Sequence, residues 1–194
     1  MTTTASTVSE AQVRDSDKLR WLMDRMEIQD LLNAYARGID HSDAEIMKQV
    51  YHQGAVDEHG IFSGDGDEFI RFTTGVNRKR FQTMQHHHTT TSMDIRADEA
   101  EVETYFFCVG KTHNGELHFS SGRSADRFER REGRWGLIRR QVIMDWTMAL
   151  PEPVPGPNDS KFMKGSIEQD DFSRTMLPRL ISGGFHPTRT ARTG

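Results

Sequence analysis

Residues 117–146 read LHFSSGRSADRFERREGRWGLIRRQVIMDW, and this stretch decides the fold. Two segments with the residue pattern of strands flank Glu132-Gly133, and a Glu-Gly pair in that setting is typical of a tight hairpin turn. We therefore predict two antiparallel strands at Leu117–Arg131 and Trp135–Trp146.

Two more strands, Thr83–Ile95 and Ala100–Lys111, are expected before this hairpin. Short turn sequences separate all four, and successive hairpins imply one curved antiparallel sheet in the second half of the chain. Prolines recur from position 151 onward. Because proline has no N–H for a sheet ladder, we place the end of the last strand and of the domain near Leu150.

The first half of the chain has a helical pattern. Apolar residues recur at steps of three and four from Ser16 to Ile39, which predicts an amphipathic helix. Ser42 is the expected N-cap of a second, short helix. A short strand at Ala55–Phe62 and one or two helical turns at Asp67–Phe72 should follow, whereas residues 73–81 fit no single pattern.

The length of 194 residues suits one domain that buries its own core without disulfides. The mean hydropathy of −0.71 is low because polar residues gather at the two ends. We expect a mobile arm at residues 1–15 and a functional domain at 16–150. Residues 151–194 should form a Pro/Gly-rich tail that packs on a neighbouring subunit or is partly disordered.

Composition excludes several classes of protein. A single cysteine, Cys108, rules out an intramolecular disulfide and a zinc site of several thiolates, so we expect a reducing, cytoplasmic location. We expect no membrane insertion, because no apolar run approaches the roughly 20 residues that span a bilayer. The net charge of −4 argues against nucleic-acid binding.

Three consecutive histidines, His86 to His88, lie inside a predicted strand. Alternation along the strand places His86 and His88 on one face and His87 on the other. They are polar residues on a half-exposed strand, a chelating pair, or site residues. Because no carboxylate follows at close spacing and no thiol cluster is present, we expect no metal.

An aspartate, Asp40, ends the first predicted helix in the sequence Tyr35-Ala-Arg-Gly-Ile-Asp. A carboxylate is unfavourable at a helix C-terminus, so its presence needs a reason. Either Asp40 caps the next helix, or it points into a cavity and hydrogen-bonds a histidine, which would fix the tautomer of that ring and raise its basicity.

These features together resemble the SnoaL-like family of the nuclear transport factor 2-like superfamily, over roughly residues 17–150. The resemblance rests on the Tyr-x4-Asp helix end, the Gln-His strand, and the stretch from Asp126 to Trp146. It implies an α+β fold in which a strongly curved antiparallel sheet, wrapped by N-terminal helices, forms a cone around a deep apolar pocket. Characterised members include dehydratases and a dehydrochlorinase that need no cofactor.

Position by position, the resemblance assigns an Asp–His dyad to Asp40 and His86, with Tyr35 and Arg140 assisting as hydrogen-bond donor and cation. His88, on the same face, is the alternative base. Tyr35 and Asp40 lie about 140° apart around a helix, so both serve one pocket only if the helix end unwinds.

Four further residues are expected to contact the substrate: His59, His88, Cys108 and Met144. His59 shares a strand face with Asp57, and this pair lines the pocket or faces solvent. A bile acid dehydratase of the family has an acidic residue in place of Cys108 and an arginine in place of Met144. Its substrate therefore does not carry over. Trp135 and Trp146 should lie in the core.

The resulting hypothesis is a cofactor-independent lyase that acts on a small hydrophobic ring compound, aromatic, lignin-derived or steroid-like. His86 and Asp40 would drive dehydration, loss of hydrogen halide, or carbon–carbon cleavage that releases formaldehyde. An isomerase with the same dyad and a non-catalytic ligand-binding protein are the alternatives. The resemblance also implies a homo-oligomer, a trimer rather than a dimer.

Overall fold

The computed structural model describes residues 10–155, 159–178 and 180. Most of the expected arm, residues 1–9, and the end of the expected tail, residues 181–194, lie outside the described residues. The chain forms, in order, α1 (Glu10–Asp40), α2 (Ala44–Lys48), β1 (Tyr51–Glu58), β2 (Ser63–Asp65), α3 (Gly66–Arg80), β3 (Phe81–Arg96), β4 (Glu99–Thr112), β5 (Leu117–Arg131), β6 (Arg134–Leu150), a 3-10 turn (Asp159–Lys161) and α4 (Phe172–Met176).

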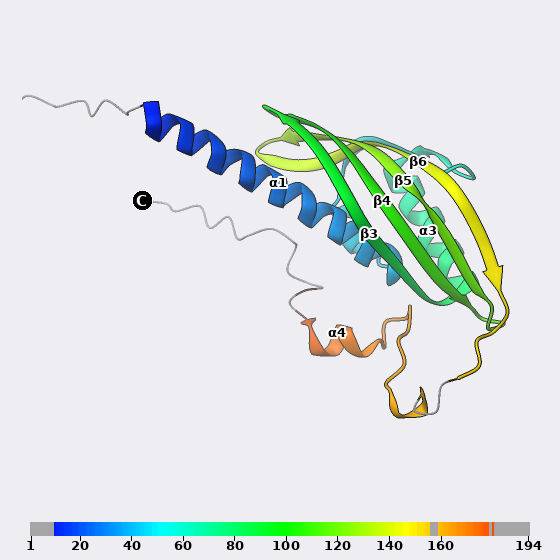
Figure 1. The fold of residues 1–194 in the computed structure, drawn as a ribbon. Coiled ribbons are helices and arrows are strands. Elements are labelled where there is room, and N and C mark those ends of the chain that lie inside the picture. Colours follow the sequence, from blue (N-terminus) through cyan, green and yellow to red (C-terminus); the bar gives the residue numbers. More distant parts are fainter. Residues whose placement is uncertain (1–9, 156–158, 179, 181–194) are drawn as a thin grey trace, which may run out of the picture.

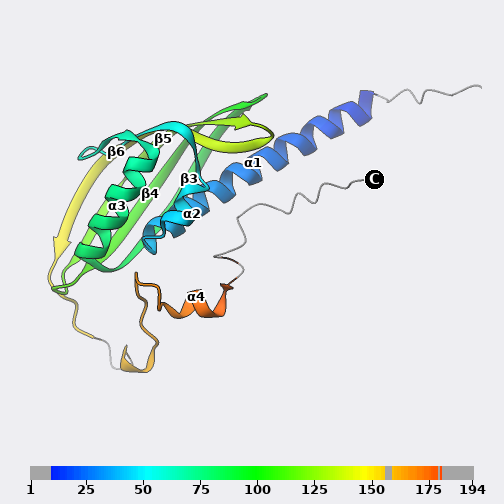
Figure 2. The same ribbon diagram turned by 180° about the vertical axis from the view of Figure 1, so that it is seen from behind.

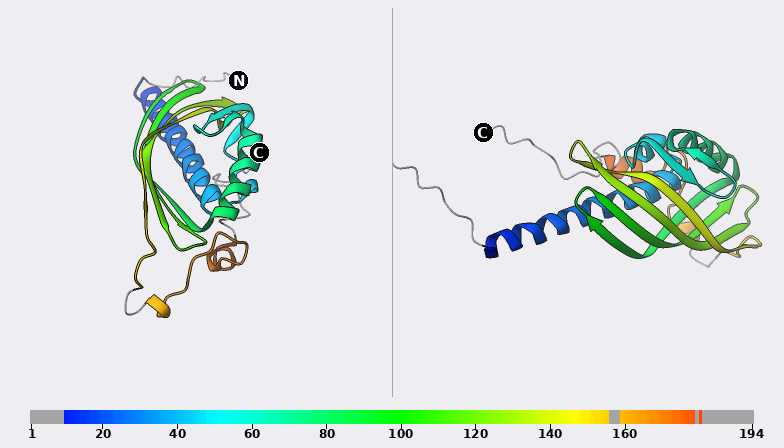
Figure 3. Two further views of the ribbon diagram at one scale, coloured as in Figure 1. Left: turned by 90° about the vertical axis from the view of Figure 1, so that its right-hand side faces the viewer. Right: turned by 90° about the horizontal axis from the view of Figure 1, so that it is seen from above.

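Six strands form one strongly curved sheet in the order β2-β1-β6-β5-β4-β3, and α1, α2 and α3 lie on its concave side (Figure 1; Figure 2). The expected α+β fold is confirmed. The sheet is open, with β2 and β3 as its edges, and β1 runs parallel to β6 while the other pairs are antiparallel. Seen end-on, the helices lie along the concave side of the curved sheet (Figure 3).

The hairpin around Glu132-Gly133 forms as expected. β5 and β6 pair from Leu117–Leu150 to Arg131–Arg134, and the turn residues Glu132 and Gly133 both have positive φ. Positive φ at both central positions defines the turn type that matches the twist of paired strands. β6 ends at Leu150, as the prolines predict.

α1 is longer than expected and divides into two halves. It begins at Glu10, six residues before the predicted start, and it remains helical through Asp40. Ile28, Leu31 and Tyr35 are buried against the sheet. The apolar residues of the first half do not reach the sheet, and Met26 is 67% exposed. Helical periodicity therefore predicted the helix but not which part of it packs.

Two helix starts correct the sequence prediction. The expected N-cap Ser42 has φ of +47° and its hydroxyl caps nothing; instead Asp43 accepts hydrogen bonds from the N–H groups of Glu45 and Ile46. α3 begins one residue after its cap, Asp65, and runs 15 residues through the segment that fitted no single pattern.

The core lies between the second half of α1, α2, α3 and the concave face of the sheet. Trp135 is completely buried there, as predicted. Trp146 is 45% exposed on the convex face, so its expected place in the core was wrong. Irregular pairing after Ser121 carries Trp146 to the outer side, where it contacts Phe107.

Part of the C-terminal segment packs on its own chain. Ile167 is buried and its N–H donates to the carbonyl of Gln82. Arg174 pairs with Asp43 at 2.8 Å and donates to the carbonyl of His41. These contacts place α4 beside the end of α1, close to Asp40. In the described part of the chain, no helix is both long and apolar enough to cross a membrane.

Candidate active site

A cavity of about 100 Å³ lies between α1 and the concave face of the sheet. Seven of the eight site residues named from the sequence line it: Tyr35, His59, His86, His88, Cys108, Arg140 and Met144. The eighth, Asp40, is not on the cavity wall and reaches it through His86. The structure thus brings together residues from α1, the β1–β2 connection, β3, β4 and β6.

Asp40 holds His86 by two hydrogen bonds. The His86 ring Nδ1 lies 2.6 Å from one carboxylate oxygen, and the backbone N–H of His86 donates to the other at 3.0 Å. β3 is an edge strand, so this N–H faces outward and would otherwise lack a strand partner. The Asp40 carboxylate therefore orients the His86 ring and accepts a hydrogen bond from the exposed edge of the sheet. These two contacts explain why a carboxylate lies at the C-terminus of α1.

The expected unwinding of α1 does not occur. The helix is regular through Asp40, and the two residues meet the site by different routes. Tyr35 faces the cavity directly, whereas Asp40 contacts the outer side of His86. A separation of about 140° around the helix is compatible with one site because the imidazole spans the gap.

The two cavity-facing histidines of β3 have opposite electrostatic environments. Burial alone would lower the pKa of His86, but the adjoining Cys108 sulfur and the Asp40 carboxylate outweigh it and raise this pKa to about 10. Burial, Arg140 and His86 lower the pKa of His88 to about 4. His88 is therefore neutral near pH 7, and its Nδ1 is buried without a hydrogen-bond partner among the described residues.

Arg140 and Tyr35 form a buried stack. Two guanidinium nitrogens of Arg140 donate to the Asp126 carboxylate at 2.8 and 2.7 Å, and Arg140 is only 2% exposed. The guanidinium carbon lies 3.9 Å from the centre of the Tyr35 ring. Burial raises the pKa of Tyr35 well above its usual range, so this residue acts as a phenol. Asp126 balances the charge that Arg140 brings into the site.

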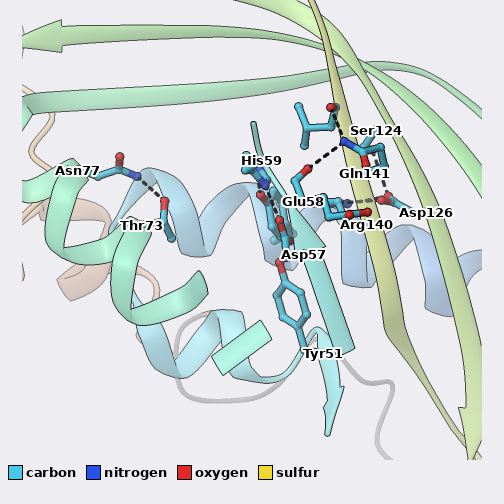
Figure 4. Close-up of polar contacts among 12 residues, drawn as sticks. Tyr51, Asp57, Glu58, His59, Thr73, Asn77, Ser124, Asp126, Arg140 and Gln141 are labelled. Atoms are coloured by element: carbon cyan, nitrogen blue, oxygen red, sulfur yellow. Dashed lines mark hydrogen bonds and ion pairs between the residues drawn. The ribbon is translucent and has the colours of Figure 1, made fainter. Parts of the chain in front are cut away.

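A second Asp–His pair, Asp57 and His59, lies beside the same cavity, which His59 lines, and Figure 4 shows the contact between the two residues. The fully buried Asp57 accepts a hydrogen bond from the Tyr51 hydroxyl at 2.7 Å, and its other oxygen lies 2.5 Å from His59 Nδ1. His59 Nε2 lies 3.3 Å from the Tyr35 hydroxyl. The sequence left open whether this pair lines the pocket or faces solvent. In the structure the pair lies at the pocket, and His59 lines it.

Other cavity residues were not identified from the sequence. Phe106, Ser120, Ser124 and Val142 complete the lining, and their alternation on β4, β5 and β6 is the only signal that could have placed them. No sequence pattern pointed to Tyr51, because its role depends on a hydrogen bond to Asp57 across a bend in β1.

The cavity is small for the expected ligand. Dry cavities of about 150 Å³ hold a benzene molecule, and this one is smaller. Met144 lies at its rim, half-exposed, with a flexible side chain that can move without disturbing the core. A ring compound therefore requires movement at the rim to enter. A larger hollow of about 590 Å³ on the sheet is lined by Asp, Glu and Arg side chains and contains none of these histidines.

No group of three or more His, Cys, Asp or Glu side chains in the described ranges is arranged to hold a metal ion. Two of the cavity histidines, His59 and His86, are instead hydrogen-bonded to separate carboxylates.

The fold and the site define a class of protein: an open, curved sheet that encloses, with its N-terminal helices, a pocket with an Asp–His dyad at one wall. Residues 20–141 match the SnoaL-like domain model, and the chain belongs to this family of the nuclear transport factor 2-like superfamily. No curated protein matches the chain in sequence.

Solved structures share the fold. A hexachlorocyclohexane dehydrochlorinase, LinA-type3 from Novosphingobium barchaimii LL02, is 22% identical with a TM-score of 0.65, and the match covers 72% of this chain and 99% of that one. The Type2 enzyme is 20% identical, with a TM-score of 0.66 and the same coverage. A Novosphingobium aromaticivorans protein, provisionally assigned as a scytalone dehydratase, is 16% identical over 70% of this chain and 90% of its own, with a TM-score of 0.60.

Proposed function

We propose that this protein is a cofactor-independent lyase that eliminates a leaving group from a small, hydrophobic ring compound. The observation that carries the proposal is the Asp40–His86 dyad, whose imidazole lines a cavity that also holds Tyr35 and Arg140. Family membership and the dehydrochlorinase structures of the same fold support the reaction class.

The dyad supplies the base. Because Asp40 accepts the Nδ1–H of His86, the neutral ring presents Nε2 as an acceptor to the cavity. Nε2 removes a proton from a carbon next to the one that carries the leaving group. The C–H electrons form the new double bond, and the leaving group departs with its bonding electrons.

The opposite side of the cavity stabilises the departing group. The Tyr35 phenol is a hydrogen-bond donor for a leaving oxygen or halide, and the buried Arg140 cation stabilises developing negative charge. The apolar residues Phe106, Val142 and Met144 favour a hydrophobic substrate. The same base would start formaldehyde release by taking a hydroxyl proton from an aryl diol.

The test is mass spectrometry of the protein with a panel of hydroxylated ring compounds, halogenated ring compounds and aryl diols, with and without a chelator. We expect loss of water, halide or formaldehyde that the chelator does not change. The His86→Gln variant should lose about a hundred- to ten-thousandfold of that rate.

His87→Gln is the matched control, because His87 is exposed on the other face of β3 and its ring hydrogen-bonds Gln85 and no cavity residue that the structure describes. An elimination that survives in His86→Gln contradicts the proposal. A product of unchanged mass identifies an isomerase instead, and bound but unaltered compounds identify a ligand-binding protein.

A further inference from the structure

The second Asp–His pair is not used by the mechanism above, although it faces the same cavity. Asp57 and His59 come from the other end of the sheet from the dyad strand β3, and they meet Tyr35 rather than His86. The His59 ring is stacked on Phe69 with centroids 4.4 Å apart, and its backbone N–H donates to the Phe62 carbonyl. The ring is therefore fixed, not a mobile surface group.

The hydrogen bonds that link Tyr51, Asp57, His59 and Tyr35 can be assigned one by one. Burial raises the pKa of Tyr51 strongly, so its hydroxyl carries a proton and donates it to Asp57. A carboxylate only accepts, so the remaining Asp57 oxygen accepts the Nδ1–H of His59. In neutral His59 the other ring nitrogen, Nε2, then has no proton and can only accept.

The direction of the last bond follows from this assignment. When His59 is neutral, the Tyr35 hydroxyl donates to His59 Nε2 and presents only its oxygen lone pair to the cavity. When His59 is protonated, Nε2–H donates to the Tyr35 oxygen, and the Tyr35 O–H is free to donate into the cavity.

We propose that the Asp57–His59 pair is a second proton-transfer unit of this site, which makes Tyr35 a donor to the leaving group when His59 carries a second proton. His59 is in this scheme a positioning residue that acts through Tyr35. The role in elimination rests on the proposed lyase function, whereas the hydrogen-bond switch between His59 and Tyr35 does not.

In a dehydration the proton balance closes. The substrate C–H proton goes to His86 Nε2, and the Tyr35 O–H proton goes to the departing hydroxyl, which leaves as water. His59 Nε2–H returns a proton to the Tyr35 oxygen. His59, whose side chain is 25% exposed, then regains its proton from solvent, and His86 releases the one that it took.

The charged and titratable groups around His59 come from several elements. Asp57 and Tyr51 lie on β1, Tyr35 on α1, His86 and His88 on β3, and Cys108 on β4. Arg140 on β6 lies over Tyr35 and is paired with Asp126 on β5. α3 contributes the apolar Phe69. Asp57 and Tyr35 are the groups in hydrogen-bond contact with the His59 ring.

The test of the switch needs no substrate. The full chain is labelled with 15N in the histidine rings and 13C at the tyrosine Cζ, and its NMR spectrum is followed against pH. The chain has only three tyrosines, so single Phe variants assign them. We expect neutral His59 to carry its proton on Nδ1, and the Tyr35 signal to move with the same midpoint as the His59 ring.

The matched variants separate this step from the titration of the other histidines. His59→Gln should remove that step from the Tyr35 signal, whereas His87→Gln should leave it. Tyr35→Phe checks the coupling from the other side, because it should change the His59 ring signals. Neutral His59 with its proton on Nε2, or a Tyr35 signal that stays constant while His59 titrates, overturns the proposal.

Kinetics then test the role in elimination on any panel compound that the wild type converts. We expect the slope of log kcat against pH to decrease by one as pH rises through the His59 midpoint, because the donor is lost while the neutral fraction of His86 still increases. His59→Gln should lower kcat about a hundredfold, with little change in KM, and should remove this change of slope. A change of slope that persists in His59→Gln refutes the role in catalysis. If the NMR coupling is present and no compound is converted, the lyase function fails and the switch stands.

Discussion

At the scale of single residues, the neighbours of a side chain determine its chemistry more than its position in the sequence. His86 and His88 lie two residues apart on one face of β3 and line one cavity. Asp40 and Cys108 lie against the first, whereas Arg140 acts on the second, so their pKa values move in opposite directions. Near pH 7 the pocket therefore holds a protonated imidazole, His86, and a neutral one, His88.

The raised pKa of His86 predicts how activity depends on pH. The base acts only when neutral, and its pKa is about 10. In His59→Gln, which lacks the opposing His59 step, kcat/KM should therefore rise about tenfold per pH unit from neutrality until it levels off near pH 10. Adding Cys108→Ala removes one of the contacts that raise this pKa, so the profile of the double variant should level off at lower pH. Rate profiles of both variants check this. A plateau of His59→Gln that begins at pH 7 contradicts the prediction.

The residues named from the sequence meet at one cavity because the resemblance to the family assigned the main ones position by position. The sequence could not choose between His86 and His88, since only the position of Asp40 at the end of α1 distinguishes them. It also left the Asp57–His59 pair open, because its place in the pocket depends on contacts with Tyr51 and Tyr35 across the fold.

At the scale of elements, local patterns predicted the strands well and the helix ends poorly. The hairpins were predictable because alternation and turn residues act over a few positions, as in Glu132-Gly133. α3 was underestimated because Thr73, Thr74 and Gly75 are weak helix formers, and packing of Phe69 and Ile70 on β1 and the core stabilises the helix instead. Ser42 failed as a cap because its backbone turns with positive φ.

The irregular pairing between β5 and β6 depends on one glycine. A Cβ at Gly122 would lie 2.2 Å from the carbonyl oxygen of Ile143, which is backbone and cannot rotate away. Gly122→Ala should therefore lower the free energy of unfolding by about 1–3 kcal/mol, as measured by urea denaturation.

Gly75→Ala is the matched control for this substitution. Its Cβ would meet nothing within 4 Å, and it lies within α3. It should raise the stability by up to about 1 kcal/mol, because alanine is the better helix former. Equal changes in the free energy of unfolding for the two substitutions would show that the close approach at Gly122 does not limit stability.

At the scale of the whole molecule, one end of the convex face of the sheet exposes a group of large apolar side chains. Tyr105, Trp146, Met148 and Leu150 are each more than two-fifths exposed, and Phe107 packs between Trp146 and Phe119. The first half of α1 also extends past the sheet with exposed apolar residues (Figure 1). Monomeric proteins seldom leave contiguous surfaces of this kind uncovered.

We therefore expect a homo-oligomer, with a trimer favoured over a dimer, that buries the convex face. Light scattering coupled to size-exclusion chromatography should give a mass above the 22.2 kDa of one chain. Trp146→Glu should shift the equilibrium toward the monomer. Ile61→Glu, which changes an exposed apolar residue in the β1–β2 connection, should leave the mass unchanged. A wild-type mass of one chain contradicts the expectation.

The cavity wall contains the only cysteine of the chain, Cys108, beside His86. The unaltered protein thus carries its own reporter of occupancy. Alkylation of this thiol requires the rim to open, so its rate measures how often the pocket admits a small molecule. Any compound that fills the pocket slows the reaction, which allows ligands to be found by thiol protection before any turnover is known.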